Sequence, residues 1–414
     1  MNRLRINHSL RNSSLVLAFC CFAAIGRADG KSQGETYQFD FADGKSQPPA
    51  AYDGKFGFGF GTTAMGQAGD GLTSEKSFYL SAVEPEGNYL VTTTFGDRSI
   101  ATTNTVKAEC RRLMVENLVT KPGEFMTRSF VVNIRTPIYP GGKVHLKPRE
   151  QTNEVMTWDD KLTLEFSGTH PVLRALKIVP DTKATTLYVA GDSTVCDQPL
   201  EPWNSWGQML PRFFDSHVAV ANYAESGESI RSSLGAHRFD KIFSLAKPGD
   251  FLFVQFGHND MKEKATNALA VYKENLRRIV VRAREAGMVP VLITPMERKA
   301  GINGNTLAGY PDTVRAVAHE NSVALIDLNA ASLKLYHALG DDLDLAFQDG
   351  THHNDYGSYE LARCVVEGIK QNRLELARYI APDAAAFDPA NPDDVHAFHI
   401  PQSPMRDNSK PEGN

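Results

Sequence analysis

Four short stretches of the chain combine the residue types that nucleophilic catalysis uses. They are GDSTV at 191–195, YAESGES at 223–229, GHND at 257–260 and DGTHHNDYG at 349–357. A serine hydroxyl is a poor nucleophile until a neighbouring base takes its proton, and an imidazole oriented by a carboxylate is a common base. Because the first stretch supplies a serine and the last supplies an aspartate with histidines, the sequence predicts a hydrolytic site.

The last stretch offers two histidines to one carboxylate. Asp349 lies three residues before His352 and four before His353, and both spacings are compatible with contact on a helical turn. Asn354 is suited to cap the helical pattern that follows, so both histidines precede that helix and helical spacing does not choose between them. Whichever histidine bonds the carboxylate through Nδ1 keeps Nε2 for the serine.

Three further positions are candidates for the rest of the site. Ser193 follows an apolar run through a glycine, so we expect it where a helix begins, and a helix N-cap is its alternative role. For Gly227 the alternative to a catalytic role is a turn glycine, and for Asn259 it is a loop asparagine. The residues by themselves leave these alternatives open.

Apolar runs alternate with helical patterns in the second half of the chain. TTLYVAG, VAVAN, DFLFVQFG, VPVLITP and VALIDLN are continuous apolar runs, typical of parallel strands covered on both faces. Apolar residues recur at helical spacing from Asn267 to Gly287, where the glycine fits a helix end. We therefore expect an α/β fold with right-handed crossovers. Ligands bind at the carboxyl ends of the strands in such sheets, and three of the polar stretches follow strands.

The first half of the chain has a different pattern. Runs such as NYLVTTTFGD, FMTRSFVVNIR and KLTLEFSG alternate, and Gly, Asp and Pro clusters separate them. This pattern indicates antiparallel strands, so we expect a β-sandwich domain at 36–181 and a catalytic domain at 184–382. Residues 383–414 are rich in Pro, Asp and Asn and predict an extended C-terminal tail.

The N-terminus resembles a secretory signal. Three arginines precede an apolar run at 15–25, and the small residue Ala28 follows it. This order predicts a signal peptide at 1–28 and a secreted protein, either periplasmic or extracellular; a mobile start on a cytosolic protein is the alternative. The run is too short to span a bilayer as a helix, so we expect no membrane partner.

Composition narrows the partners and cofactors. Hydrophobic residues make up 42% and charged residues 22%, as in folded globular proteins. The formal net charge is −5, and without a basic stripe we expect no nucleic-acid partner. Cys110, Cys196 and Cys364 are widely spaced and match neither a disulfide framework nor a metal-ligand set, so we expect no metal and no other cofactor.

Together the four stretches resemble the blocks of the SGNH (GDSL-like) hydrolase superfamily, named for a Ser, a Gly, an Asn and a His. The resemblance implies a flavodoxin-like three-layer α/β/α parallel sheet. Its D-x-x-H pattern selects Asp349 and His352 as partners of Ser193. It also implies an oxyanion hole formed by the backbone N–H groups of Ser193 and Gly227 and the side-chain amide of Asn259.

Residues 186–370 resemble one branch, the rhamnogalacturonan acetylesterases, through AGDSTVCDQPLEPWNSWGQMLPRFF, NYAESGESIRSS, QFGHNDMK and DGTHHNDYGSYELA. The resemblance implies a serine esterase that removes acetyl groups from acetylated pectic polysaccharide through a covalent acetyl-enzyme. Many members have another residue in place of His353. Some relatives carry an N-terminal sandwich, galactose-binding-like, whose role is to hold polysaccharide or only to pack. The alternative functions are an esterase for another acylated glycan such as xylan, and a secreted glycan-binding protein without catalysis.

Four residues near these blocks are candidate substrate contacts, each with a structural alternative. Trp203 has the ring to stack on a sugar, or packs in the core of an amphipathic helix. Arg231 contacts an acidic substrate or is a surface charge. His258 lines the cleft or packs against its neighbours, and His353 is a cleft wall, a substrate contact or a surface residue.

Overall fold

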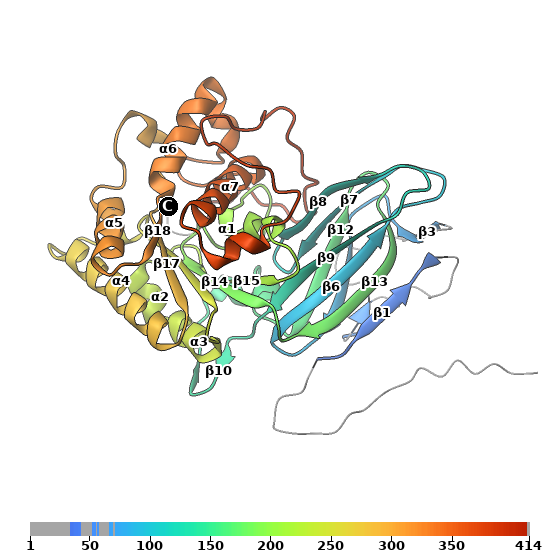
Figure 1. Ribbon diagram of the computed structural model, residues 1–414, viewed down its shortest axis with the longest axis horizontal. Coiled ribbons are helices and arrows are strands. Elements are labelled where there is room, and N and C mark those ends of the chain that lie inside the picture. Colours follow the sequence, from blue (N-terminus) through green and yellow to red (C-terminus); the bar gives the residue numbers. More distant parts are fainter. Residues whose placement is uncertain (1–33, 43–51, 55, 58–65, 69–70, 412–414) are drawn as a thin grey trace, which may run out of the picture. The chain divides into compact units, whose positions relative to one another are not determined.

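The part of the chain that carries the four polar stretches is built on five parallel strands and is called the parallel part (Figure 1). They are β14 (Thr185–Gly191), β15 (Val218–Asn222), β16 (Phe251–Gln255), β17 (Val289–Ile293) and β18 (Ala324–Ile326). Their order in the sheet is β18-β17-β16-β14-β15, and each neighbouring pair is parallel. These strands are the five apolar runs of the sequence, which confirms the predicted α/β class.

Helices cover both faces of this sheet. Successive residues of its strands point to opposite sides, so each strand presents apolar side chains to both faces. Leu187 and Val189 of β14 pack in one core, and Tyr188 and Ala190 pack in another. The first core receives α1 (Trp206–Met209), α6 (Leu328–Leu339) and α7 (Asp355–Gln371). The second receives α2 (Ile230–Gly235), α3 (Arg238–Leu245), α4 (Ala268–Glu285) and α5 (Tyr310–Glu320). The predicted helix from 267 to 287 corresponds to α4.

Antiparallel strands form the preceding part of the chain, in two sheets that pack around a third core. One sheet holds β1 (Tyr37–Asp40), β3 (Gly66–Ala68), β4 (Gly71–Thr73), β6 (Gly87–Phe95), β9 (Met126–Ile134) and β13 (Val172–Asp181). The other holds β2 (Phe56–Gly57), β5 (Phe78–Val83), β7 (Thr102–Ala108), β8 (Arg112–Thr120) and β12 (Lys161–Ser167). This is the sandwich that the alternating sequence predicts. A separate hairpin joins β10 (Ile138–Tyr139) and β11 (Gly142–Lys143).

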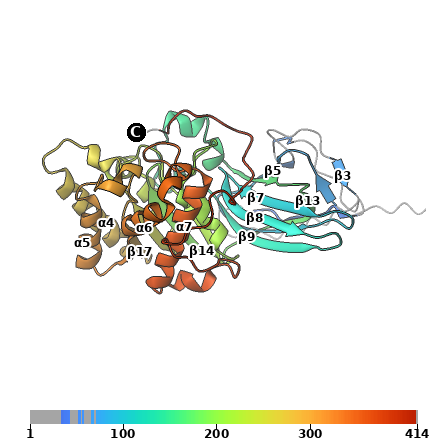
Figure 2. The same cartoon turned by 90° about the horizontal axis from the view of Figure 1, so that it is seen from above.

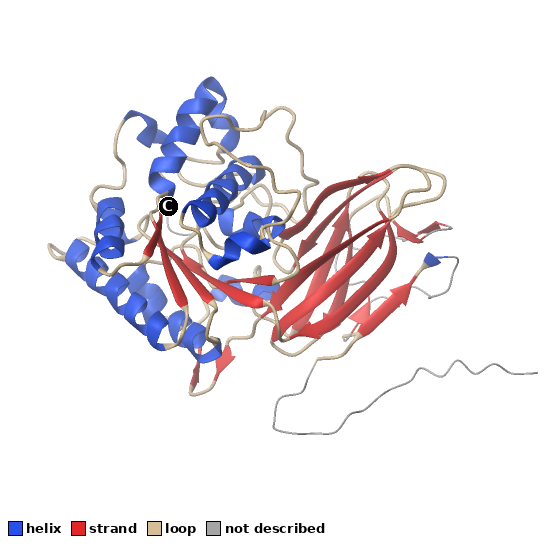
Figure 3. Cartoon of the chain, in the orientation of Figure 1, coloured by secondary structure: helices blue, strands red, loops and turns tan. Residues whose placement is uncertain are grey.

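The two parts share one sheet, which the sequence does not predict. β15 of the parallel part pairs in parallel with β9 of the antiparallel part, with Ala219 opposite Val131 and Val220 opposite Val132. The strands in Figure 3 therefore continue from one part into the other without a break. The expected boundary near 181–184 lies in the short turn between β13 and β14. Residues from Gly34 onward form one compact unit.

The computed structural model describes residues 34–42, 52–54, 56–57, 66–68 and 71–411. The predicted signal peptide at 1–28 lies outside the described residues. Within the described residues, no helix has the length and apolar character that crossing a membrane requires. Short 3₁₀ helices join the main elements: 148–151, 155–157, η4 (Leu210–Phe213), 260–262, 299–303, 340–346 and 375–379.

The segment after residue 383 is irregular, as predicted, but it is not a loose tail. Ile400 is 3% exposed and packs in the same core as α7. Ser403 donates its backbone N–H to Glu201 at 2.9 Å and its hydroxyl to Glu165 of β12 at 2.7 Å. In Figure 2 this dark red segment runs from the helices of the parallel part to the strands of the antiparallel part. It therefore docks on both parts of the chain.

The docked segment gives a stability prediction. Ile400→Ala removes a buried side chain and should lower the free energy of unfolding by about 2 to 5 kcal/mol, because the cavity it leaves can collapse only in part. Asn408→Ala, at an exposed position of the same segment, is the matched control and should change little. Urea unfolding followed by circular dichroism measures both variants. Equal midpoints for the two variants would show that the segment is not docked in solution.

Candidate active site

Ser193 lies in a tight turn at the carboxyl end of β14. The backbone N–H groups of Val195 and Cys196 both donate to the carbonyl of Asp192, at 3.0 Å each. The first helix after this turn, α1, begins only at Trp206. The expectation that Ser193 sits where a helix begins is therefore wrong. A single hydrogen-bonded turn carries the Ser193 hydroxyl instead.

A glycine is required immediately before this turn. A Cβ atom on Gly191 would lie 2.6 Å from Val195 Cγ2 and 2.7 Å from the carbonyl oxygen of Gln255 in β16. Both distances are shorter than side chains tolerate. The glycine of GDSTV therefore lets residues 192–196, the predicted nucleophile turn, lie directly against the neighbouring strand β16.

The hydroxyl, imidazole and carboxylate form one hydrogen-bonded chain. His352 Nε2 lies 2.8 Å from Ser193 Oγ, and His352 Nδ1 lies 3.0 Å from Asp349 Oδ2. Asp349 Oδ1 also accepts the backbone N–H groups of Thr351 and His352, each at 2.7 Å. The structure thus brings together the three residues that the sequence selects, with the imidazole oriented as a base requires.

The environment keeps Asp349 ionised. Burial by itself would raise the pKa of Asp349, but the neighbouring imidazole of His352 and the two backbone N–H groups hold it well below its ordinary value. An ionised carboxylate accepts the Nδ1–H of His352 and so fixes the tautomer that leaves Nε2 facing the hydroxyl.

His353 belongs to the core and not to the substrate surface. It is 2% exposed, its Nε2 lies 2.9 Å from the hydroxyl of Tyr336 in α6, and its ring centroid lies 4.0 Å from that of Phe347. Burial, and then the electrostatic effect of the neighbouring His352, lowers the pKa of His353 to about 3, so its ring is neutral. The expectation of a substrate contact at His353 is therefore wrong, because no face of the ring is accessible.

The candidate oxyanion residues lie on two adjacent loops. Gly227 follows β15 and has a φ of +74°, a left-handed conformation that favours glycine. Asn259 follows β16, and its Nδ2 donates to the carbonyl of Glu228 at 3.0 Å. This bond ties the Asn259 loop to the Gly227 loop and uses one of the two amide hydrogens. The role of Gly227 and Asn259 in binding an oxyanion remains a prediction.

Gln198 is a residue of the site that the sequence reasoning missed. Its Nε2 donates to the backbone carbonyl of Ser193 at 2.8 Å and to the hydroxyl of Ser226 at 3.2 Å. The side chain of Gln198 thus links the nucleophile turn to the residue before Gly227. A glutamine in a loop carries no pattern of its own in a single sequence, so only the fold identifies it.

His258 lies behind the nucleophile turn instead of lining a cleft. It is 2% exposed, its Nδ1 lies 3.3 Å from Asp192 Oδ2, and its Nε2 lies 3.0 Å from the carbonyl of Met296. Burial by itself would raise the pKa of Asp192, but the contact with His258 and the hydrogen bonds from Thr194 together lower it overall. The expected cleft contact at His258 is therefore wrong, because both ring nitrogens are engaged inside the protein.

The remaining two candidates differ from each other. Trp203 is 5% exposed, donates its Nε1–H to the carbonyl of Asp407 at 3.0 Å, and meets the His352 ring edge to face at 5.7 Å. Its ring thus supports the imidazole, and its contact with a sugar stays a prediction. The Arg231 side chain is 72% exposed and lies 3.9 Å from Glu263. Its contact with an acidic substrate stays a prediction.

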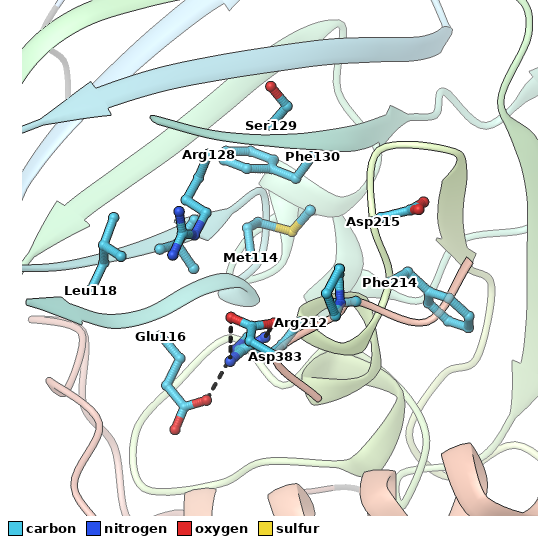
Figure 4. A pocket seen from close by; sticks show the side chains of 13 residues that line it. Met114, Glu116, Leu118, Arg128, Ser129, Phe130, Arg212, Phe214, Asp215 and Asp383 are labelled. Carbon is cyan, nitrogen blue, oxygen red and sulfur yellow. Dashed lines mark hydrogen bonds and ion pairs between the residues drawn. The ribbon is translucent and has the colours of Figure 1, made fainter. Parts of the chain in front are cut away.

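A separate cavity lies at the surface between β8, β9 and η4 (Figure 4). It has a volume of about 370 Å³ and includes Arg128, Phe130 and Met114 among its lining residues. Across it, Arg212 pairs with Glu116 at 3.0 Å and with Asp383 at 3.1 Å. It shares no lining residue with the Ser193–His352 site.

A cluster of buried carboxylates adjoins the loop after β15, where the backbone N–H of Glu225 donates to the carbonyl of Gly191 at 3.1 Å. Among the described residues, Glu150, Glu154 and Glu225 are close enough to share a cation. Arg238 pairs with Glu150 at 2.7 Å, and Arg149 pairs with Glu154 at 3.3 Å and contacts Glu225. Each of the three carboxylates therefore has an arginine partner, and these ion pairs hold the cluster together.

Asp260 gives a prediction for the pH dependence of stability. It is 4% exposed, its Oδ1 accepts the N–H of Ile230 at 3.0 Å, and its Oδ2 has no hydrogen-bond partner among the described residues. Burial raises its pKa from 3.8 to about 7. The folded protein therefore holds this proton more tightly than the unfolded chain, and stability falls as the pH rises from 3.8 through about 7.

Asp260→Asn should remove this dependence, since an amide cannot ionise. The free energy of unfolding of the variant relative to the parent should increase with pH across this window, by up to about 1.4 kcal/mol for each pH unit. Urea unfolding at pH 5, 6, 7 and 8 measures the difference. A difference that is constant with pH would contradict the raised pKa of Asp260.

Comparisons with known proteins agree with this site. Residues 189–358 match the GDSL-like lipase/acylhydrolase family. The rhamnogalacturonan acetylesterase RhgT of Bacillus subtilis is 34% identical over 220 residues, which are 48% of this chain and 95% of RhgT. The uncharacterized esterase YxiM of the same organism is 29% identical over 399 residues, 87% of this chain and 97% of YxiM. The crystal structure of YxiM aligns with 82% of this chain and 99% of its own, at 27% identity and a TM-score of 0.46.

The extent of these matches assigns the family. The chain covers nearly all of RhgT at 34% identity, and the region that matches the family includes Ser193, Asp349 and His352. The chain therefore belongs to the GDSL-like lipase/acylhydrolase family and is a carboxylic ester hydrolase.

Proposed function

We propose that this esterase removes acetyl groups from acetylated rhamnogalacturonan, with Ser193 as the nucleophile, His352 as the base and Asp349 as its orienting carboxylate. The observation that carries the catalytic roles is the hydrogen-bonded chain from Ser193 Oγ through His352 to Asp349, at 2.8 and 3.0 Å. The identity to RhgT, a rhamnogalacturonan acetylesterase, supports the substrate class.

The proposed reaction has two steps. His352 takes the proton of Ser193 while Oγ attacks the acetyl carbonyl, and the oxyanion accepts hydrogen bonds from the N–H groups of Ser193 and Gly227 and from the Asn259 amide. The C–O bond to the sugar then breaks, and the sugar oxygen leaves with the proton from His352. A water activated by His352 attacks the acetyl-enzyme, which releases acetate and returns the proton to Ser193.

Two parts of the proposal concern the rest of the chain. We propose that residues 1–28 direct secretion, on the basis of their basic start, short apolar run and Ala28. For the sandwich, polysaccharide binding and packing against the esterase part remain alternatives. Polysaccharide binding would raise the local substrate concentration.

Substitution of the reacting residues tests the mechanism. Ser193→Ala and His352→Ala should each lower kcat for p-nitrophenyl acetate by about 10³- to 10⁶-fold, because they act as one unit. His353→Gln is the matched control and should retain a kcat within about tenfold of the parent, since its amide can still bond Tyr336. Rates are compared only for variants whose circular dichroism and Tm show a folded protein. Parent-like activity in Ser193→Ala, or equal losses in the two histidine variants, would refute these roles.

A substrate panel tests the specificity. Acetate release should show a higher kcat/KM on acetylated rhamnogalacturonan than on acetylated xylan. Within a p-nitrophenyl ester series, activity should fall from acetate to longer acyl chains. A preference for acetylated xylan would instead favour an esterase for another glycan. Binding of the polysaccharide without acetate release would favour a non-catalytic glycan-binding protein.

A further inference from the structure

The turn between β7 and β8 of the sandwich inserts its side chains into the esterase part. Residues 109–111 form this turn, and Arg111 has a left-handed φ of +60°. The carbonyl of Cys110 accepts the side-chain amide of Gln208 in α1 at 2.8 Å. Arg112 donates to the carbonyl of Val220 in β15 at 2.9 Å. Cys110 and Arg112 are thus in contact with the esterase part, on either side of Arg111.

Arg111 makes the most extensive of these contacts. Its side chain is 3% exposed, and Nη1 donates to the carbonyls of Gln198 and Trp203 at 3.0 Å each. Nη2 lies 2.6 Å from Glu201 Oε1. One guanidinium therefore holds both ends and the middle of the segment 198–203.

Both ends of this segment contact the reacting residues. At one end, the Gln198 side chain donates to the carbonyl of Ser193 at 2.8 Å. At the other end, the Trp203 ring meets the His352 ring edge to face at 5.7 Å. Any shift of the segment therefore moves a support of the nucleophile and a support of the base at the same time.

We propose that Arg111 of the sandwich is a positioning residue for ester hydrolysis, which it promotes by fixing the segment 198–203 against Ser193 and His352. This inference rests on the proposed roles of those two residues. It assigns the sandwich a part in the chemistry that does not depend on its binding a glycan.

The geometry suits an arginine and no other cation. A guanidinium carries several N–H donors in a rigid plane, so it can bond two carbonyls and a carboxylate together, whereas an ammonium is a single compact charge. The charge of Glu201 has a second partner, since Lys107 Nζ lies 3.4 Å from the same oxygen. Ser403 also donates its backbone N–H to Glu201 at 2.9 Å. Removal of the guanidinium therefore leaves Glu201 a partner, but it leaves the two carbonyls without their donor and Asp355, 3.7 Å from Nη2, without that cation.

RhgT offers a useful contrast. Nearly all of RhgT, 95%, aligns with only 48% of this chain. The unaligned remainder of RhgT is therefore too short to form a domain equivalent to the whole sandwich. In this chain the sandwich is present, and Arg111 in its β7–β8 turn contacts the segment 198–203.

Two variants test whether Arg111 positions the segment 198–203 or only balances the charge of Glu201. R111K keeps a cation beside Glu201 but cannot span both carbonyls. The double variant R111M/E201Q removes both charges, and its new amide oxygen can still accept the N–H of Ser403. The matched control is R128M, which replaces a partly exposed arginine of β9 that donates to the carbonyl of Thr127. Kcat, KM and the pH dependence of kcat/KM are measured on p-nitrophenyl acetate, below the Tm of each variant.

If Arg111 positions the segment 198–203, R111K and R111M/E201Q should each lower kcat by about 10- to 100-fold. Small misplacements of reacting groups produce effects of this size. The KM of this small ester and the pH at half-maximal kcat/KM should change little, and R128M should match the parent. The Tm of R111K should stay close to that of the parent, so the loss of kcat is not a loss of fold.

Three outcomes would overturn the inference or its basis. Parent-like kcat in R111K shows that the bonds to the two carbonyls do not matter. Recovery of both Tm and kcat in R111M/E201Q shows that Arg111 only balances the charge of Glu201. If the parent is active and Ser193→Ala equally active, the proposed function fails first, and the role of Arg111 fails with it.

Discussion

The hydrogen bond between His352 Nε2 and Ser193 Oγ joins residues that are 159 positions apart in the chain, and the rest of the site depends on it. A serine hydroxyl is a weak nucleophile unless a base, here the imidazole of His352, is held within hydrogen-bond distance. That imidazole must also keep one tautomer, which requires an ionised carboxylate at its other nitrogen. Asp349 meets this requirement inside the protein because two backbone N–H groups and His352 compensate for its burial.

The parallel sheet brings these groups to one edge. Ser193 and Gly227 follow the neighbouring strands β14 and β15, and Asn259 follows β16 on the other side of β14. The loops at that edge are then tied to one another through side chains, by Gln198 between Ser193 and Ser226 and by Asn259 at Glu228. In the proposed mechanism, these ties hold the predicted oxyanion donors in place before the substrate arrives, and such preorganised donors are usually the largest source of catalytic stabilisation.

The sandwich is bound to this arrangement by a shared sheet and by buried charges. The pairing of β15 with β9 continues the hydrogen bonds from one part into the other. Buried ions are costly unless they are paired, so Arg111 with Glu201 and Arg112 with Asp197, at 2.6 and 3.4 Å, favour one relative placement of the two parts. The C-terminal segment adds Ser403, which bonds residues of both parts.

The sequence pattern predicted those features that depend on interactions between residues close together in the chain. The five apolar runs gave the parallel strands, helical spacing gave α4, and Asn354 caps α7 by accepting the N–H of Gly357 at 3.1 Å. The choice of His352 over His353 needed a family pattern, because spacing alone allows both. What remained unpredictable depends on distant contacts, such as the burial of His353 against Tyr336, which nothing in its neighbouring residues indicates.

Supporting residues are hidden from sequence reasoning for the same reason. Gln198 and Arg111 have no motif, and their importance comes only from where the fold places the carbonyls that they bond. The docking of the segment after 383 was likewise concealed by a composition rich in Pro, Asp and Asn, which describes irregular backbone but not its burial.

Covalent labelling tests the central claim most directly. A dialkyl p-nitrophenyl phosphate reacts with a serine only when its hydroxyl is activated by a base, and it leaves a stable phosphoryl adduct that peptide mass spectrometry can locate. The account predicts one adduct per chain, on the peptide that contains Ser193, formed at a rate that falls sharply in His352→Ala. An adduct on another serine, or labelling of Ser193 at the parent rate without His352, would contradict it.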